Sequence, residues 1–482
     1  MGASAEAEPL LATPFLGVDD VARLRHVLLA FSMILSFCLA LFFSIRTEYT
    51  EHCLHSSEAA TTGTLAVIAY YLCHAVSNPI LGKLSDSVGR KPLLLAGIAA
   101  IVTVFGLFAV ISDPLTFILL FAALGVVDSS NVMYHLMIVD TASVDLRAGG
   151  GLFAFFASRA QVDGVLAAPP KGGGAEVDEP IQQRRVAVLF SAIYVASLLA
   201  AGLGFGAAVL LEGGIGVRGT VAVAAASILP LFFFVAYALP ETARLAEPSG
   251  ADSCSGAVSA VLAEQAAGLA LLTETPRRRL LLFATFCQHG AAAGASALMI
   301  YWAVYKFGFG MPAQTAVLLV GLWAIGLGVA LLQGVFIPVF GLDGPRACVA
   351  VIGVSACCAA FLALAFEPWM VFVGVMSVLG AAINPEVRSQ ITADVALADQ
   401  GFVQGAIQTV NSVGDSLGAF VLLVTFEDTT DDDVAHDTHR GRHSIRANLI
   451  WHVILGLNFC AVCALLLVKE TPPRPQTARP ML

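Results

Sequence analysis

The chain has 482 residues, of which 58% are hydrophobic and only 12% are charged. Soluble domains carry about twice that share of charged residues, so the composition excludes a soluble globular protein. The formal net charge of −10 does not identify a partner, because much of it comes from one acidic segment, 427–443.

Long apolar runs recur along the whole chain. Crossing the hydrocarbon core takes about 20 apolar residues, and the backbone polar groups there must be satisfied within each segment, so every run is expected to be a helix. The first run lacks a small-residue cleavage site and is interpreted as a permanent helix. The sequence predicts twelve spans: 26–45, 61–81, 92–112, 114–139, 187–211, 220–239, 280–305, 313–340, 346–366, 369–390, 402–425 and 447–468.

The placement of charge predicts an orientation. Most of the 25 Lys and Arg residues fall in the two tails and in the loops on the same side as the tails. The positive-inside rule therefore places both termini in the cytoplasm. The N-terminal segment 6–11 resembles an acidic dileucine sorting signal, so both the plasma membrane and an endolysosomal or vacuolar membrane stay open.

The longest hydrophilic linker divides the chain into two halves. We expect a tail at 1–25, a six-helix half at 26–239, a linker at 240–279, a second six-helix half at 280–468 and a tail at 469–482. Short echoes predict that the halves are pseudo-symmetric repeats. One echo is the Pro-Glu-Thr after the sixth run, at 240–242, and the Glu-Thr-Pro after the twelfth, at 470–472.

One short segment, which we expect to form a loop between the second and third spans, carries a distinctive motif. It reads Gly82-Lys-Leu-Ser-Asp86-Ser-Val-Gly89-Arg90-Lys91. It resembles the loop 2–3 signature of the major facilitator superfamily, and this resemblance extends over nearly the whole chain. It implies an all-α membrane protein with twelve transmembrane helices in two pseudo-symmetric six-helix halves. Segment 399–408 is similar to the tetracycline-resistance-type and hippocampus-abundant-transcript-like branch.

The resemblance also implies a conformational gate. In the superfamily, the acid of the motif caps the start of span eleven, and the Arg of the motif pairs with an acid at the end of span four. The alternative is a set of ordinary interfacial charges. The expected gate residues are Gly82, Asp86, Gly89, Arg90, Lys91, Asp140, Gly401 and Gly405.

Polar residues inside the spans are the other functional candidates, because ionisable groups are costly in a membrane. Gln404, Gln408, Asn411 and Asp415 share one face of span eleven, and Asp128, Asn131 and His135 share one face of span four. Hydrogen bonding between helices is the alternative explanation. We expect three residues to couple protons: Asp128, His135 and Asp415. We expect seven others to line a substrate cavity: Asn131, Gln288, His289, Asn384, Gln404, Gln408 and Asn411.

Taken together, these patterns predict a secondary active transporter that moves a small organic solute by alternating access, coupled to protons. Two alternatives stay open: a symporter or facilitator for sugars, organic acids or vitamins, and a transporter-like scaffold or receptor that moves no solute. Nothing resembles a nucleophile–base pair or a metal site, so no enzyme, cofactor or bound metal is expected. The expected partners are the solute, protons and the lipid bilayer, with no nucleic acid, and the chain is expected to be a monomer.

Overall fold

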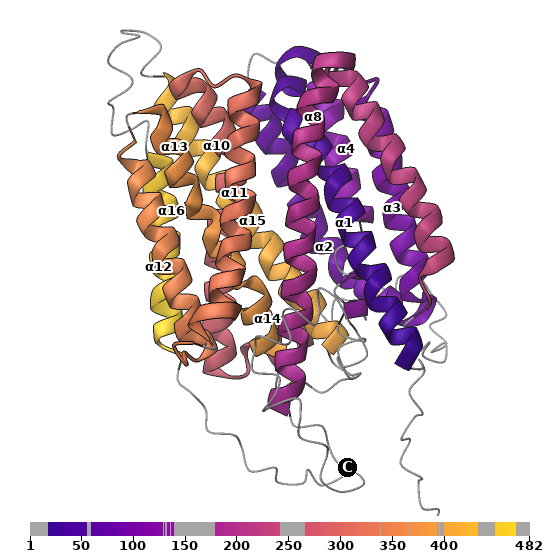
Figure 1. Cartoon of the computed structure of the whole chain (residues 1–482), viewed down its shortest axis with the longest axis vertical. Helices are drawn as coiled ribbons and strands as arrows, with labels where there is room; N and C mark the ends of the chain where they lie inside the picture. The colour runs from indigo at the N-terminus through magenta and orange to yellow at the C-terminus, as the bar shows by residue number, and fades with distance from the viewer. Residues whose placement is uncertain are drawn as a thin grey trace, which may run out of the picture.

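The computed structural model describes residues 18–54, 59–128, 130, 133–134, 136–138, 179–241, 266–337, 339–365, 367–392, 395, 400–431 and 449–468. Its regular structure is helical throughout this described part, as the apolar runs predict. The helices stand side by side and follow the long axis of the molecule (Figure 1). Among the described residues, eight helices are long and apolar enough to cross a membrane. The chain is therefore an integral, multi-pass membrane protein.

The first part of the chain forms one bundle, which we call the first bundle. Its helices are α1 (Val18–Glu48), continued by the π-helical turn η1 (Tyr49–Cys53), then α2 (Ala59–Val88), α3 (Arg90–Phe108), α4 (Pro114–Val127) and α8 (Glu179–Ala238). α1 packs along α8, and α2 packs along α4. Their core is rich in aromatic rings, with Phe42 and Phe105 4.8 Å apart and Phe117 and Phe121 4.9 Å apart between ring centroids.

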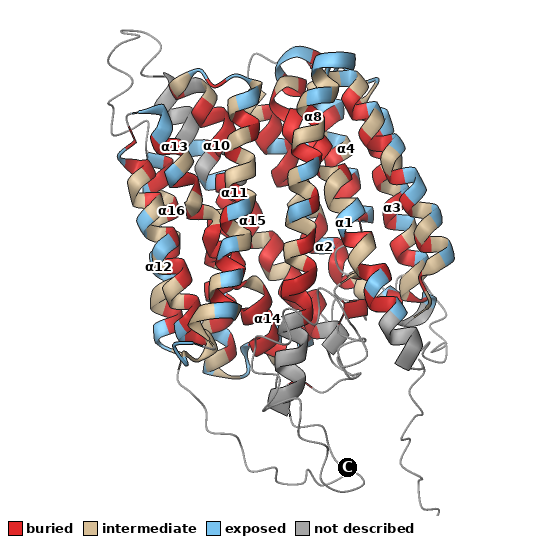
Figure 2. Ribbon diagram, in the orientation of Figure 1, coloured by how far each residue is buried: buried red, intermediate tan, exposed pale blue. Residues whose placement is uncertain are grey.

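The rest of the chain forms the second bundle. Its helices are α10 (Pro276–Phe307), α11 (Met311–Leu331), η3 (Leu332–Phe336), α12 (Gly344–Ala363), α13 (Pro368–Gly374), η4 (Val375–Ile383), α14 (Asn384–Thr392), α15 (Gln400–Asp431) and α16 (Leu449–Leu466). The two bundles have separate hydrophobic cores. In Figure 2 the buried residues run through the inside of both bundles. Large apolar residues such as Leu210 are exposed, as lipid contact requires.

Several helix boundaries differ from the prediction. The runs 187–211 and 220–239 are not separated by a loop, because they join within α8 through Gly216, whose φ of 74° turns the chain. The run 369–390 is interrupted by the 3-10 helix η4. Pro385 follows this helix, and because proline has no N–H it cannot continue the hydrogen-bond ladder of a preceding helix.

Glycines allow the closest helix crossings. A Cβ on Gly418 of α15 would lie 2.1 Å from the carbonyl oxygen of Gly290 on α10. A Cβ on Gly125 of α4 would lie 2.2 Å from the carbonyl oxygen of Tyr70 on α2. Such small-residue contacts are how helices approach one another in membranes. The two crossings set the distances between the four helices that hold most of the polar residues discussed below.

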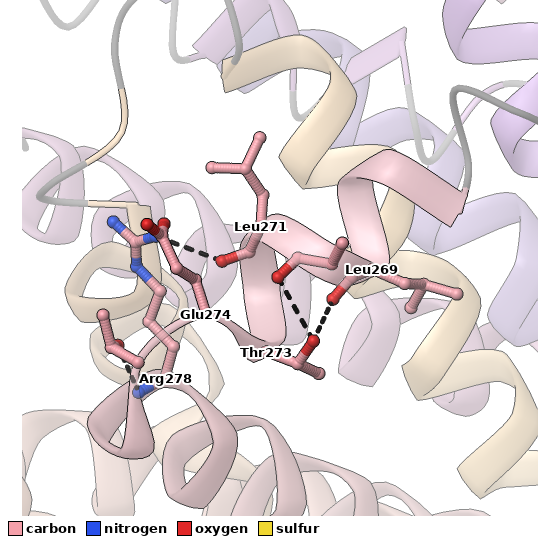
Figure 3. A network of polar contacts seen from close by, with 7 residues as sticks. Leu269, Leu271, Thr273, Glu274 and Arg278 are labelled. Atoms are coloured by element: carbon pink, nitrogen blue, oxygen red, sulfur yellow. Dashed lines mark hydrogen bonds and ion pairs between the residues drawn. The ribbon is translucent and has the colours of Figure 1, made fainter.

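The linker ends in a tight turn that leads into α10. Figure 3 shows Arg278, which is 6% exposed, donating from Nη1 to the Leu271 carbonyl at 3.1 Å. The Glu274 carboxylate lies 3.6 Å from the same nitrogen, and Thr273 donates to the Leu269 carbonyl at 2.8 Å. These contacts hold the helical segment 266–273 against the start of α10.

The two bundles meet along a continuous line of contact. α2 packs along α15, and α8 packs against both α11 and α14. A small apolar cluster of Ile68, Ala419 and Leu423 joins α2 to α15. Smaller contacts, of α10 with α2 and of α1 with α11, also join the two bundles.

Candidate functional site

Buried and half-buried polar side chains gather where α2, α4, α10, α14 and α15 come together. We call this group the polar seam. Its members are Tyr70, His74, Asn78, Asp128, His289, Arg388, Gln404, Gln408, Asn411, Ser412 and Asp415. The seam combines residues that the sequence selected on separate spans with five that it did not select as site residues: Tyr70, His74, Asn78, Arg388 and Ser412.

Asp128 anchors the first-bundle side of the seam. It is the C-terminal cap of α4, with an extended ψ of 90°, and it is 7% exposed. The Tyr70 hydroxyl donates to Oδ2 at 2.8 Å, while the backbone N–H and hydroxyl of Ser130 donate to Oδ1 at 3.0 and 2.5 Å. Both carboxylate oxygens are thus occupied by neutral donors.

The predicted continuous helix 114–139 is therefore wrong at Asp128, where the backbone leaves the helical region. A carboxylate that accepts from its own backbone two residues later competes with the helix for that N–H, which explains the break. Helical residues follow at 130, 133–134 and 136–138. Asn131, His135 and Asp140 lie outside the described residues.

His74 of α2 links the two bundles. Its ring stacks on Tyr70 with 5.2 Å between ring centroids and 18° between planes. Its Nδ1 lies 3.1 Å from Asn78 Nδ2 and 3.2 Å from Ser412 Oγ on α15. The ring is 1% exposed, and Nε2 has no hydrogen-bond partner among the described residues. The sequence signal was present, since Tyr70, His74 and Asn78 are spaced four residues apart on one helix face.

On the second-bundle side, Asp415 and His289 form a close pair. His289 Nδ1 lies 3.0 Å from Asp415 Oδ1, with side chains 19% and 9% exposed respectively. The two residues come from α15 and α10, which the glycine contact of Gly290 with Gly418 holds together. His74 lies between the two acids, because its ring stacks on Tyr70, the donor to Asp128, and its Nδ1 lies 3.2 Å from Ser412 Oγ, one turn before Asp415 on α15. The seam therefore places two carboxylates and two imidazoles within one electrostatic neighbourhood.

The other polar residues of α15 point to different neighbours. Arg388 of α14 donates from Nη2 to Gln408 Oε1 at 2.8 Å. Gln404 is 2% exposed and Asn411 is 1% exposed. Neither polar atom of the Gln404 amide has a partner among the described residues, and Asn411 Oδ1 has none either. Among the described residues of the predicted stripe, Gln408 and Asp415 therefore make side-chain hydrogen bonds, and Gln404 makes none.

Two further predicted cavity residues lie on α10 and α14. Gln288 donates to Asn458 Oδ1 of α16 at 2.7 Å and packs on Gly380, inside the second bundle. Asn384 stands at the first position of α14, one helical turn before Arg388, with an Oδ1 that has no partner among the described residues. Their place in a substrate cavity stays a prediction.

The motif segment is helical where a loop was expected. α2 extends to Val88 and α3 begins at Arg90, so the chain turns at Gly89 alone, with φ of 102°. The φ value explains the glycine, because other residues rarely adopt it. Asp86 therefore belongs to the last turn of α2, and its side chain lies outside the described residues. Gly82 is also within α2, where an added Cβ would meet nothing within 4 Å.

Glu241 completes this turn, and sequence reasoning did not select it. Its Oε1 accepts from the backbone N–H of Arg90 at 3.0 Å, and its Oε2 accepts from that of Lys91 at 3.1 Å. A carboxylate on the free N–H groups at a helix start is favourable. Glu241 is the acid of the Pro-Glu-Thr echo, so this echo has a structural role: it ties the end of α8 to the start of α3.

Removing this cap is expected to weaken the fold. Glu241→Ala leaves two backbone donors without their carboxylate and should lower stability by about 1 kcal/mol. The measurement is thermal unfolding of purified protein in one detergent. Glu212→Ala on α8 is the matched control, because Glu212 makes no hydrogen bond or ion pair with the described residues. Equal melting temperatures for the two variants would contradict the capping role.

The bundles also touch at the opposite end, where α1 ends and α2 begins. Tyr301 OH lies 3.2 Å from Thr50 Oγ1, and a Cβ on Gly63 would lie 2.3 Å from the same hydroxyl. Ser44 Oγ of α1 lies 3.5 Å from Thr315 Oγ1 of α11. We call these five residues the Tyr301 seal, because each contact joins the first bundle to the second.

Gly401 and Gly405 begin α15, at the same end of the molecule as Gly89. An added Cβ on Gly405 would meet nothing within 4 Å. No described atom therefore approaches Gly405 closely, and its role in a gate stays a prediction. Arg90 and Lys91 are held at their backbone N–H groups by Glu241.

No protein-family model matches the chain, and no curated protein matches it in sequence. Solved structures match over nearly their full length. The human organic anion transporter MFSD10 (TETRAN) has a TM-score of 0.62 and 16% identity, over 92% of this chain and 99% of that chain. The nucleoside transporter NupG has a TM-score of 0.59 and 14% identity, over 93% and 100%.

The fold is the major facilitator fold. The motif at 82–91 predicted this, and the structural matches confirm it. Both neighbours are transporters by name, in line with the expectation that the chain is not an enzyme. Within the major facilitator fold, the polar seam lies between the bundles that this protein shares with its neighbours.

Proposed function

We propose that the chain is a secondary active transporter that moves a small organic solute by alternating access, coupled to protons. The observation that carries the proposal is the polar seam: ionisable residues lie buried exactly along the contact between two bundles. Buried ionisable groups are costly in a membrane and mark transport pathways.

The proposed architecture is the one expected from the sequence. It has twelve spans in two pseudo-symmetric six-helix halves, 26–239 and 280–468, with both termini cytoplasmic and the linker 240–279 on the same side. The Tyr301 seal then faces away from the cytoplasm, and Gly89 faces it. In this arrangement the described contacts close the non-cytoplasmic end, and rocking of the halves would open it.

In the proposed coupling, Asp415 and His289 exchange the transported proton. Their contact joins two helices of the same bundle, so it survives rocking. The contact of His74 with Ser412 joins different bundles, so it must break when the bundles separate at that height. His74 would then lose a polar partner beside Asp128, which links proton affinity to conformation. Asn131 and His135 stay proposed members of the pathway.

The proposed gate keeps Asp86, Arg90 and Asp140 as a latch at the cytoplasmic end, with Gly401 and Gly405 opposite it. Glu241 supports this proposal because it fixes the backbone at Arg90 and Lys91. A latch that must form and break needs one rigid side, and the capped start of α3 supplies it.

The proposed solute class rests more on the polar side chains of the seam than on the similarity to other transporters. MFSD10 is named as a transporter of organic anions and NupG as a transporter of nucleosides. These solutes share small size and several hydrogen-bonding groups. The unpartnered amides of Gln404 and Asn411 suit such groups. The plasma membrane and an endolysosomal membrane both fit this proposal.

The test is uptake into liposomes that contain the purified full-length protein. Labelled organic acids, sugars, vitamins and nucleosides are offered with and without an imposed pH gradient. Accumulation of one class that depends on the gradient is the expected result. Uptake that only equilibrates would favour the facilitator alternative. Folded protein that moves none of them would favour the scaffold or receptor alternative.

A further inference from the structure

Arg388 is a buried cation that has no counter-charge among the residues that the structure describes. Its side chain is 8% exposed, on α14 in the second bundle. Among the described residues its guanidinium has one hydrogen-bond partner, the neutral Gln408 amide, at 2.8 Å. A buried charge of this kind is strongly unfavourable unless something pairs with it.

The nearest acid on the same helix is already engaged. Glu386 accepts from Gln390 Nε2 at 2.8 Å and from Gln333 Nε2 at 3.0 Å. Further along α15, Asp415 is paired with His289. Among the described residues, these two acids are therefore paired with other side chains, and the guanidinium is left with the Gln408 amide.

Unpartnered amides flank the guanidinium on α15. Gln404 lies one helical turn from Gln408 on the same face, is 2% exposed, and has neither amide atom paired among the described residues. Asn411 lies one turn to the other side of Gln408 with an unpaired Oδ1. A cation and amide groups with free donors and acceptors are what a carboxylate with neighbouring polar groups requires.

We infer that Arg388, with Gln404 and Gln408, binds the carboxylate of an organic anion, which is the transported solute. The guanidinium is a planar fork that matches a carboxylate, and Lys lacks this geometry. α14 packs against α8 of the first bundle and against α15, so the site lies beside the contact between the bundles. The inference rests on the proposed carrier function, since transport gives the anion access to a site this deeply buried.

A structural role and a binding role of Arg388 predict opposite changes in stability when the residue is replaced. A residue that holds the fold together destabilises the protein when it is removed. A binding residue whose charge is unpaired destabilises the empty protein by its presence. Arg388→Gln should therefore leave the melting temperature of the ligand-free protein unchanged or higher, while it removes affinity for the anion.

The test uses purified full-length protein in lipid nanodiscs and matched probes. The probes are benzoate with benzamide, indole-3-acetate with indole-3-acetamide, and 4-hydroxyphenylacetate with its amide. Ligand-dependent thermal stabilisation reports affinity by mass action. We expect the carboxylate of at least one pair to stabilise the protein more than its amide. In Arg388→Gln the affinity for that carboxylate should fall by about 30-fold or more, as for loss of one member of a buried charge pair.

Three further variants make the result specific. Arg388→Lys keeps the charge without the fork and should lose less affinity than Arg388→Gln. Gln404→Leu removes an amide that has no hydrogen bond to lose, so it should fold normally and still weaken the carboxylate. Arg346→Gln is the control, because that side chain is 70% exposed and pairs with Asp343 at 3.4 Å; its carboxylate affinity should match that of the wild type.

Several outcomes overturn the anion site: amides that stabilise as well as their carboxylates, silence across all three pairs, or a carboxylate preference that survives in both Arg388→Gln and Gln404→Leu. A ligand-free Arg388→Gln that unfolds early, with carboxylate binding intact in Gln404→Leu, assigns Arg388 to structure and overturns the site as well. Carboxylate binding without uptake in liposomes contradicts the carrier function and supports the site. Uptake of neutral solutes without any carboxylate preference supports the carrier function and contradicts the anion site.

Discussion

Asp415→Asn is expected to abolish accumulation of solute against its gradient. Asn keeps the size of the side chain and can still hydrogen-bond His289, whose Nδ1 lies 3.0 Å from Asp415 Oδ1, but it cannot take up or release a proton. A pH difference of about one unit can support about tenfold accumulation per proton, the equivalent of about 1.4 kcal/mol. The wild type should approach this ratio, and the variant should stop at equal concentrations on both sides.

The measurement is uptake into liposomes with an imposed pH gradient, alongside solute exchange without a gradient. Exchange should persist in Asp415→Asn, since only the coupling is removed. Asp113→Asn is the matched control. Asp113 lies between α3 and α4, where hydrogen bonds from the Thr116 hydroxyl and backbone N–H hold the pKa of its carboxyl below the usual value. It stays ionised at working pH, and Asn caps a helix nearly as well. Full accumulation by Asp415→Asn would remove this residue from the coupling.

Gly418→Ala is expected to be the most destabilising single methyl group in α15. Its Cβ would lie 2.1 Å from the carbonyl oxygen of Gly290 and 2.5 Å from the Cα of the same residue. These are backbone atoms, so α10 and α15 must separate. Overpacking of this kind typically costs about 1–3 kcal/mol, and the displaced helices carry His289 and Asp415.

Gly405→Ala on the same helix is the matched control, because its Cβ would meet nothing within 4 Å. It should be neutral or stabilising, since Ala favours a helix by about 0.5–1 kcal/mol over Gly. Thermal unfolding of both variants in one detergent decides the question. If Gly418→Ala and Gly405→Ala unfold at the same temperature, the close crossing of α10 and α15 is not what positions His289 and Asp415.

The positions of helices could be predicted from the sequence because a segment that crosses lipid needs an apolar surface and must satisfy its backbone hydrogen bonds internally. The same rule cannot place a break inside an apolar run. The turn at Gly216, the cap at Asp128 and the 3-10 helix η4 arise from local hydrogen bonding, which hydropathy does not record.

Only part of the candidate site could be predicted from the sequence. Asp415 could be selected because a carboxylate within an apolar run is rare. That His289 is its partner depends on the contact of Gly290 with Gly418, which no spacing along the chain reveals. Glu241 and Arg90 are 151 residues apart in sequence, so their contact required the fold. The sequence shows that Arg388 carries a charge, but only the structure shows that no acid among the described residues pairs with it.

The most direct test of alternating access is a reversible lock on the Tyr301 seal. Ser44 Oγ and Thr315 Oγ1 lie 3.5 Å apart on opposite bundles, so the double variant Ser44→Cys, Thr315→Cys places two thiols close enough for a disulfide. Each single variant, treated with the same oxidant, controls for the native cysteines. Uptake into liposomes should stop when the double variant is oxidised and return when it is reduced. Oxidised, fully cross-linked protein that still transports at the wild-type rate would contradict a carrier whose bundles must part at this end.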